Sequence, residues 1–149
     1  MGNAIGGVTI TPLKIIAGEN GSVMHGLKAD ESTFDGFGEA YFSSVKFGAI
    51  KGWKRHTRMT LNLVVPVGII RFVIYDDRKD SPGYQLFEEY SLGPEVNYAR
   101  LTIEPGLWMA FQGQAEGLNL LLNLASMRHE PSEAEQLPID NNHIPNFKW

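Results

Sequence analysis

Short runs of apolar and β-branched residues recur along the chain, separated by glycine, proline, asparagine or aspartate. Alternation of apolar and polar residues over about four to eight positions is typical of strands, and β-branched and aromatic residues suit a pleated surface. Almost no segment repeats apolar residues at the helical spacing of about 3.6 residues. The pattern predicts strands over residues 8–16, 39–47, 59–67, 69–75, 84–92, 97–103, 108–112 and 118–125.

Turn-forming residues lie between these predicted strands. Gly68 separates two of them, a polar cluster fills residues 76–83, and Gly93-Pro94 and Glu104-Pro105-Gly106 mark two further turns. Many short strands punctuated in this way predict an all-β sandwich or barrel. The length of 149 residues suits one domain, residues 1–149.

The C-terminal segment, residues 127–149, has a different character. It is polar, it contains three prolines, and it has an acidic stretch in which residues 132–135 suit one short helical turn. We expect a mostly irregular tail. Ile144, Phe147 and Trp149 near its end predict that the tail packs on the barrel.

Composition narrows the class of protein. The chain is 43% hydrophobic and 20% charged, as is usual for a globular protein, and no apolar run reaches the length of a membrane span. Its net charge is -4, without a dense basic cluster, so we expect neither nucleic acid nor membrane as a partner. The N-terminus lacks the basic and apolar regions of a signal peptide, which favours a cytoplasmic location.

One stretch, residues 48–68, keeps the spacing of a cupin's first metal motif. The glycines at its two ends are in register, but the His-x-His of the motif is Lys54-x-His56 and its glutamate is Leu61. The histidine of the second cupin motif falls at Met109. One remaining histidine cannot hold zinc, iron or manganese in a stable site, so we expect no metal and no cofactor.

Several segments resemble one cupin family, the dTDP-4-dehydrorhamnose 3,5-epimerases. The matching segments are Gly38-Glu-Ala-Tyr-Phe42, Gly48-Ala-Ile-Lys-Gly-Trp53, Tyr75-Asp-Asp-Arg78, Ile103 to Phe111, and Leu121 through Asp140. The resemblance implies a jelly-roll barrel of short antiparallel strands and metal-free chemistry on nucleotide-linked keto sugars, used in making surface polysaccharide. It also implies a homodimer, in which residues 1–17 would form an exchanged N-terminal strand.

The catalytic residues of that family are partly replaced. Its histidine base corresponds to Lys54, its tyrosine acid to Asn123, and the aspartate that partners its histidine to Asp140. A second branch of sugar cupins, the dTDP-hexose 3,4-ketoisomerases, carries Arg-Gly-x-His-Ala-His. Laid on the segment that begins at Lys51, this motif places its second histidine at His56.

Lys54 and His56 are two residues apart in a strand and therefore face one side, which would be the barrel interior. There His56 would take a proton next to a carbonyl, and Lys54 would hold the enolate oxygen or a phosphate. The predicted catalytic residues are His56, Lys54 and Asp140. The predicted substrate-binding residues are Lys51, Arg58, Asn62, Asn123, Tyr41 and Trp108.

The leading hypothesis is therefore an epimerase or 3,4-ketoisomerase of nucleotide sugars, of the dTDP-4-keto-6-deoxyhexose type. The alternative is a non-catalytic cupin that binds a sugar, a nucleotide sugar or a partner enzyme. In that case His56 and Lys54 would be a hydrogen-bonded and a salt-bridged barrel residue, Asp140 a turn cap and Asn123 a satisfied buried amide. A site on an outer face of the barrel is a further possibility.

Overall fold

The computed structural model describes residues 4–149, and it confirms the all-β prediction. The strands are β1 Val8–Pro12, β2 Ile15–Ile16, β3 Val23–Met24, β4 Glu39–Ser44, β5 Ile50–His56, β6 Leu61–Val67, β7 Ile70–Tyr75, β8 Phe87–Leu92, β9 Ala99–Ile103, β10 Trp108–Gly113, β11 Leu120–Ala125 and β12 Ala134–Leu137. A single 3-10 turn, Pro131–Glu133, precedes β12 within this part of the chain.

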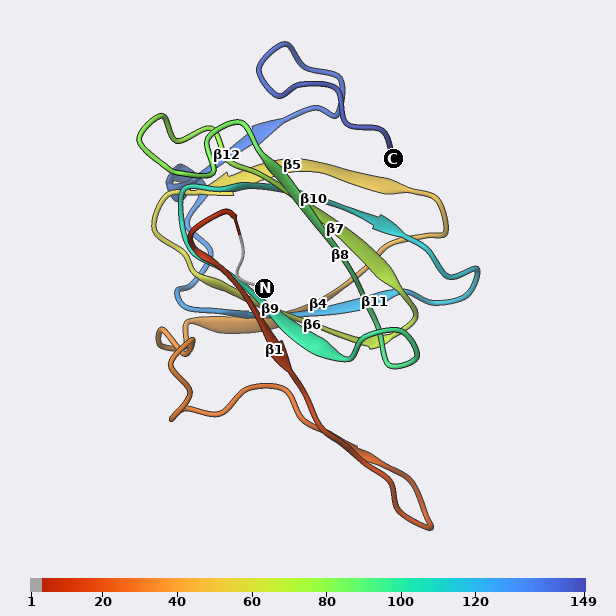
Figure 1. Cartoon of the computed structure of the whole chain (residues 1–149). Coiled ribbons are helices and arrows are strands. Elements are labelled where there is room, and N and C mark those ends of the chain that lie inside the picture. The colour runs from red at the N-terminus through yellow and green to blue at the C-terminus, as the bar shows by residue number, and fades with distance from the viewer. Residues whose placement is uncertain (1–3) are drawn as a thin grey trace.

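Two five-stranded sheets pack face to face (Figure 1). The first has the strand order β1-β9-β6-β11-β4 and the second the order β12-β5-β10-β7-β8. Neighbouring strands in both sheets are antiparallel, and most neighbours are distant in sequence, as in a jelly roll. The pocket described below lies between these sheets.

Apolar side chains fill two separate layers. The larger cluster lies between the sheets and includes Leu63, Phe72 and Leu101, all buried. The smaller cluster covers the outer face of the second sheet, where Trp53 and Trp108 are buried. Because β10 therefore has apolar neighbours on both faces, its apolar residues do not show from sequence which side faces the barrel interior.

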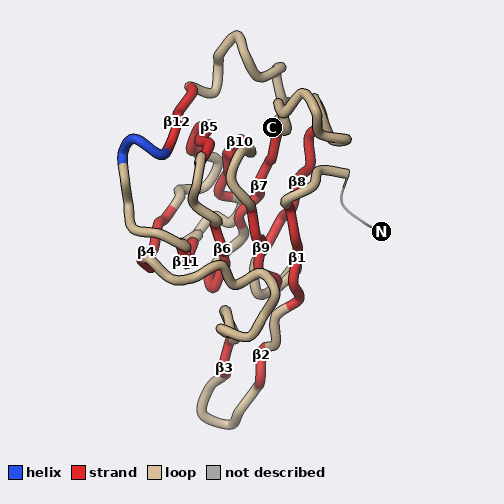
Figure 2. Tube along the Cα trace, turned by 90° about the vertical axis from the view of Figure 1, so that its left-hand side faces the viewer, coloured by secondary structure: helices blue, strands red, loops and turns tan. Residues whose placement is uncertain are grey.

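The tail is more ordered than predicted. Residues 134–137 form β12, which pairs with β5 so that Ala134 lies opposite His56. Farther along, Ile144 is buried in the outer cluster, and Phe147 and Trp149 pack against it. Figure 2 shows this part of the chain beyond β12 and β5, outside the barrel. Burying each such side chain stabilises the fold by about 1.5–3 kcal/mol.

The predicted strand over residues 8–16 is interrupted. β1 pairs with β9 as far as Pro12, after which the chain leaves the sheet and forms the short β2–β3 hairpin. The hairpin projects away from the two sheets (Figures 1 and 2). It carries apolar side chains into solvent, with Ile16 51% and Val23 61% exposed. Residues 1–3 of the predicted N-terminal segment lie outside the described residues.

A strand predicted over residues 84–92 begins only at Phe87. Gln85 has a positive φ of 67°, and its N–H bonds to the carbonyl of Asp76, so the chain is still turning at this point. From residue 4 to the end, the structure contains no helix long and apolar enough to cross a membrane.

Candidate active site

A pocket of about 200 Å³ lies between the sheets, toward the β4 edge of the first sheet. Its lining comprises Lys51, Gly52, Lys54 and His56 from β5, Met109 and Phe111 from β10, Tyr41 and Ser43 from β4, Leu61 and Leu63 from β6, and Leu121 and Asn123 from β11. Apolar walls with a few polar groups are typical of small-molecule sites.

From Gly52 to His56, strand alternation on β5 sorts the side chains between this pocket and the outer face. Gly52, Lys54 and His56 line the pocket, and Lys51 also lines it because the pairing of β5 with β10 shifts register between Lys54 and Lys51. Trp53 instead belongs to the outer apolar cluster, and Arg55 bonds to Asp77 at 2.8 Å. The retained spacing Lys54-x-His56 thus places an ammonium and an imidazole side by side on one wall.

His56 is held by a buried carboxylate. Its Nδ1 contacts Oε1 of Glu133, a residue that is only 2% exposed. The other carboxylate oxygen, Oε2, accepts the backbone N–H groups of Thr57, Arg58 and Met59, each at 3.2 Å. An ionised carboxylate only accepts hydrogen bonds, so Nδ1 carries a hydrogen, and in the neutral imidazole Nε2 then keeps its lone pair. His56 is thereby oriented as a general base.

The ionisation of Glu133 is favoured by the same contacts. Burial alone would raise the pKa of this carboxyl. The hydrogen bonds from His56 and from the backbone of Arg58 and Met59 outweigh burial, and the pKa lies below its usual value. A carboxylate that stays negative keeps the Nδ1–H form of His56 in place.

Asp140, the predicted partner of His56, is exposed in the loop after β12 and makes no hydrogen bond to the imidazole. Glu133 holds that position instead, because the 3-10 turn and the pairing of Ala134 with His56 bring it beside the ring. The sequence offers no local signal for this contact, since Glu133 is one of three glutamates between residues 130 and 135.

Lys54 supplies the positive charge of the pocket. Among residues 4–149, no carboxylate lies within ion-pair distance of its ammonium, and its side chain makes no hydrogen bond. Leu61 and Met109 line the same space. An unpaired cation in a partly apolar pocket is well placed to stabilise an oxyanion of a ligand.

Tyr41 and Asn123 form a pair on the opposite wall. They lie directly across from each other on β4 and β11, and Asn123 Nδ2 donates to the Tyr41 hydroxyl at 2.9 Å. Asn123 is 3% exposed, and its Oδ1 is the one buried side-chain polar atom without a partner in the described part of the chain. Leaving such an atom unpaired costs about 1–3 kcal/mol, which a ligand hydroxyl would recover.

Lys51 lies at the exposed rim of the pocket. Its Nζ donates to Ser43 Oγ at 2.8 Å and lies 5.9 Å from the centre of the Phe111 ring. Sequence reasoning misses Ser43, because a lone serine on a strand carries no distinctive signal. Together the two residues join the edges of the facing sheets beside the opening.

Three predicted substrate-binding residues lie outside the pocket. The Trp108 side chain is on the outer face and donates to Asp77 at 2.9 Å. Asn62 points away from the pocket, where its amide binds Arg100 and Thr33. Arg58 is exposed and does not line the pocket. Alternation explains the first two, since the neighbours of each on its strand point to the opposite face.

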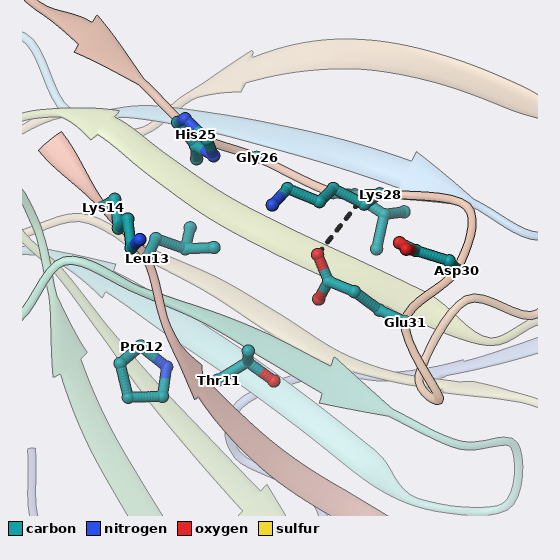
Figure 3. A pocket seen from close by; sticks show the side chains of 10 residues that line it. Thr11, Pro12, Leu13, Lys14, His25, Gly26, Lys28, Asp30 and Glu31 are labelled. Carbon is teal, nitrogen blue, oxygen red and sulfur yellow. Dashed lines mark hydrogen bonds between the residues drawn. The ribbon is translucent and has the colours of Figure 1, made fainter. Parts of the chain in front are cut away.

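A larger hollow, of about 390 Å³, lies at the base of the β2–β3 hairpin (Figure 3). Of its two carboxylates, Asp30 and Glu31, the second is already engaged, since Glu31 pairs with the buried Arg100 and accepts the backbone N–H of Lys28 at 3.1 Å. No unpartnered buried polar atom points to a ligand at this hollow within residues 4–149. The described residues also hold no group of three or more metal-binding side chains.

Comparisons with known proteins bear on this site. No family model matches the chain. The crystal structure of a dTDP sugar isomerase from Desulfovibrio desulfuricans is 38% identical, with a TM-score of 0.93, and the match covers 98% of this chain and 92% of that one. NovW, a 4-keto-6-deoxy sugar epimerase from Streptomyces spheroides, is 18% identical over 99% of this chain and 77% of its own, with a TM-score of 0.86, which shows a shared fold.

Two curated relatives are similar over most of their length. The "probable low-salt glycan biosynthesis epimerase" of Haloferax volcanii is 28% identical over 89% of this chain and 87% of its own. The spore coat polysaccharide biosynthesis protein SpsL of Bacillus subtilis is 26% identical over 97% of this chain and 96% of its own. These findings confirm the jelly-roll fold and the resemblance predicted from the sequence.

Proposed function

We propose a function on the premise that the chain belongs to the cupin family of dTDP-sugar isomerases and epimerases. The chain is an isomerase that moves a proton at the carbon next to the carbonyl of a nucleotide-linked keto sugar. The observation that carries this proposal is the oriented base His56, backed by Glu133, beside the unpaired ammonium of Lys54.

The pocket supports a defined first step. His56 Nε2 takes the α-proton, the electrons of the C–H bond form a carbon–carbon double bond, and the carbonyl oxygen becomes an enolate oxygen. Lys54 stabilises that negative charge where it develops. In this step Lys54 acts as the electrophile, although it stands where the related epimerases have their base.

The pocket is large enough for only part of a nucleotide sugar. A volume of about 200 Å³ admits a hexose ring but not a nucleotide. A neighbouring groove of about 420 Å³ shares Gly52 and Lys54 with the pocket and runs along β12 to Pro138. The nucleotide extends through the opening toward this groove, with its diphosphate near Lys51, whose ammonium is exposed at the rim.

The substrate class follows from the relatives. A dTDP-4-keto-6-deoxyhexose fits the chemistry named for the solved structures, and the curated relatives point to polysaccharide or glycan assembly as the setting. A cytoplasmic location, expected from the sequence, stays a prediction, which fractionation of cells that produce the chain would test.

Solvent deuterium exchange tests this function. The purified chain is incubated in D₂O with a panel of nucleotide-linked 4-keto sugars, and NMR follows deuterium at the carbons beside the carbonyl. We expect incorporation by the wild type and a loss of at least about 100-fold in His56→Asn, since a positioned base contributes about 10²–10⁴. The matched control His129→Asn, at an exposed histidine, should behave as wild type.

Binding of these sugars without any deuterium incorporation would refute the isomerase and favour the alternative, a cupin that only binds its ligand. The replacement of the family's base and acid by Lys54 and Asn123 is the feature that gives this alternative its weight. Thermal-shift titration with the same panel, run in parallel, separates failure to bind from failure to react.

We also propose that the chain forms a homodimer through the β2–β3 hairpin. Ile15, Ile16, Val23 and Met24 expose large apolar side chains there, and such a concentration is expected to be covered in solution. Light scattering after size-exclusion chromatography should give a dimer for the wild type and a monomer for Ile16→Lys/Val23→Lys. A dimer that survives both substitutions would contradict this role of the hairpin.

A further inference from the structure

We propose that the proton moved by this site is the one on C5 of the sugar, the carbon that carries the methyl group, rather than the one on C3. The inference rests on the proposed function and specifies which side of the carbonyl reacts. Two features of the pocket carry it, an apolar recess beside the base and an unpartnered amide oxygen on the facing wall.

The two carbons next to the carbonyl of a 4-keto-6-deoxyhexose differ in polarity. C3 carries a hydroxyl group, whereas C5 carries the methyl group, C6. Removal of the C5 proton allows inversion at C5, whereas a 3,4-ketoisomerase must remove the proton from C3. The orientation of the ring against His56 therefore decides the class of reaction.

A small recess adjoins the pocket beside His56. It is lined by four residues of the pocket, Lys54, His56, Leu61 and Met109, and by Met59, Ile103, Leu107 and Glu104. Met59, Ile103 and Leu107 are each only 2% exposed, whereas Glu104 is an exposed residue. The volume of the recess, about 10 Å³, is close to the smallest that holds one water molecule. One methyl group is of similar size and fits there, whereas a hydroxymethyl group is too large.

The facing wall of the pocket suits a hydroxyl group of the ring. Asn123 is 3% exposed, and its Nδ2 is engaged by the Tyr41 hydroxyl at 2.9 Å. Its Oδ1 has no partner within residues 4–149, and an amide oxygen can only accept a hydrogen bond. A hydroxyl group on C2 or C3 donates to this oxygen, which a methyl group cannot do.

Two orientations of the ring bring its carbonyl oxygen to Lys54, and the pocket favours one of them. In the first, the methyl group lies in the recess, C5 faces His56 and a hydroxyl group meets Asn123. In the second, C3 faces His56, its hydroxyl group enters the mainly apolar recess, and the methyl group points toward Asn123. Burying a polar group without a partner costs free energy, so the second orientation is penalised at both ends.

The reaction at C5 needs only solvent as a co-reactant. His56 Nε2 takes the C5 proton, the electrons of the C–H bond form a C4–C5 double bond, and the carbonyl electrons move to the oxygen beside Lys54. When a proton returns to C5, the double-bond electrons form the new C–H bond and the carbonyl is restored at C4. In D₂O the returning proton is replaced by deuterium, and no step involves C3.

The position of deuterium tests the assignment. The chain is incubated in D₂O with a dTDP-4-keto-6-deoxyhexose, NMR follows C3 and C5 separately, and His56→Asn gives the background rate at each carbon. We expect exchange at C5 at least about 100-fold above background and exchange at C3 at background. Exchange at C3 above background, with or without exchange at C5, would overturn the proposal and leave the proposed function standing. Background rates at both carbons would instead overturn the proposed function.

The 6-hydroxy analogue, a dTDP-4-ketohexose, tests the recess. It should exchange at C5 about 100-fold more slowly than the 6-deoxy sugar, because an apolar pocket discriminates by about that factor against an added hydroxyl group. Leu107→Ala enlarges the recess and should reduce this ratio of rates by about tenfold or more. Both rates come from one preparation, so the ratio does not depend on how much of the variant is folded.

The matched control is Leu101→Ala, at a buried leucine that lines neither the pocket nor the recess, and it should keep the wild-type ratio. Equal rates for the two sugars with the wild type would show that the methyl group does not occupy the recess, and would overturn the proposal.

Asn123→Leu tests the polar end of the pocket. With the wild type, the 2-deoxy or the 3-deoxy analogue should exchange at C5 at least about 100-fold more slowly than the parent sugar, because the buried oxygen of Asn123 then stays unpaired. With Asn123→Leu the same analogue and the parent sugar should differ by less than about threefold. A purely structural effect of the substitution would slow both sugars equally and keep the wild-type ratio, which would overturn the role of Asn123.

Discussion

Replacing Glu133 by glutamine changes one atom of the site and should disable the base. In the native chain, Oε1 faces His56 Nδ1 and Oε2 faces three backbone N–H groups. A carboxamide has only one oxygen, so one of these two sets of donors must face its NH₂ group. The three N–H groups outnumber the single ring donor, so we expect the oxygen to stay with them and the NH₂ to face His56.

The consequence for His56 follows from hydrogen-bond direction. Nδ1 must then accept, which moves the ring hydrogen to Nε2, the nitrogen that the reaction needs unprotonated. Loss of the correct tautomer should reduce deuterium exchange by about 10²–10⁴. Loss of the charge-assisted hydrogen bond should also lower the free energy of unfolding by about 1.5–3 kcal/mol.

Deuterium exchange, followed by NMR, measures the loss of base activity in this variant, and urea unfolding measures its loss of stability. Glu135→Gln is the matched control, because Glu135 lies on β12 in a half-exposed pair with Arg55 at 2.9 Å. Such a surface pair contributes about 0–1 kcal/mol, so stability and exchange should change little. Exchange by Glu133→Gln within threefold of wild type would refute the claim that Glu133 sets the tautomer of His56.

Three further predictions concern charge and packing. Lys54→Met should reduce exchange by at least about 100-fold yet shift the unfolding free energy by less than about 1 kcal/mol, because the ammonium has no partner among residues 4–149 to lose. Substantial exchange without the ammonium would count against the enolate role. The folded-state pKa of Asp77 is lowered because hydrogen bonds from His143, Trp108 and Arg55 outweigh burial, and that of Glu133 because hydrogen bonds from His56 and the backbone do so. The stability that these two carboxylates contribute should be complete above about pH 4.5 and should be lost as the pH falls below their ordinary pKa values of 3.8 and 4.5. Urea unfolding midpoints that do not fall between pH 7 and pH 3 would contradict this. Ile144→Ala should cost about 2–5 kcal/mol in urea unfolding, because Ile144 is buried on the outer face, and a cost near zero would show that the tail is not held there.

Most strands were predictable from runs of β-branched and other apolar residues bounded by turn residues. The sequence of β11 is apolar on both sides of Asn123, so that residue was picked out by the family resemblance and not by alternation. The strand that carries Lys54 and His56 was located by the spacing of the cupin motif, and the two-residue separation then placed both side chains on one face.

The errors arose where burial covers both faces of a strand. Asn62 is buried because residues 25–35 cover the outer side of the first sheet, as its bond to Thr33 at 3.1 Å shows. Trp108 is buried because the tail covers the outer side of the second. When neither face of a strand meets solvent, the sequence does not indicate whether a polar or aromatic residue on it points into the pocket or away from it.

Glu133 and β12 were missed for a different reason. The sequence Ala-Glu-Gln-Leu has little β preference, and it becomes a strand by pairing with β5, which lies far away in the chain. That pairing is also what brings Glu133 to His56. The most informative contact of the site is therefore a product of tertiary structure.

A crystal structure of the His56→Asn variant with a dTDP-4-keto-6-deoxyhexose tests the central claim most directly. The account predicts the sugar ring between the two sheets, with its carbonyl oxygen within hydrogen-bond distance of Lys54 Nζ. Its α-carbon should lie beside the substituted side chain on β5. A sugar bound at the base of the hairpin, or with its carbonyl away from Lys54, would contradict the account.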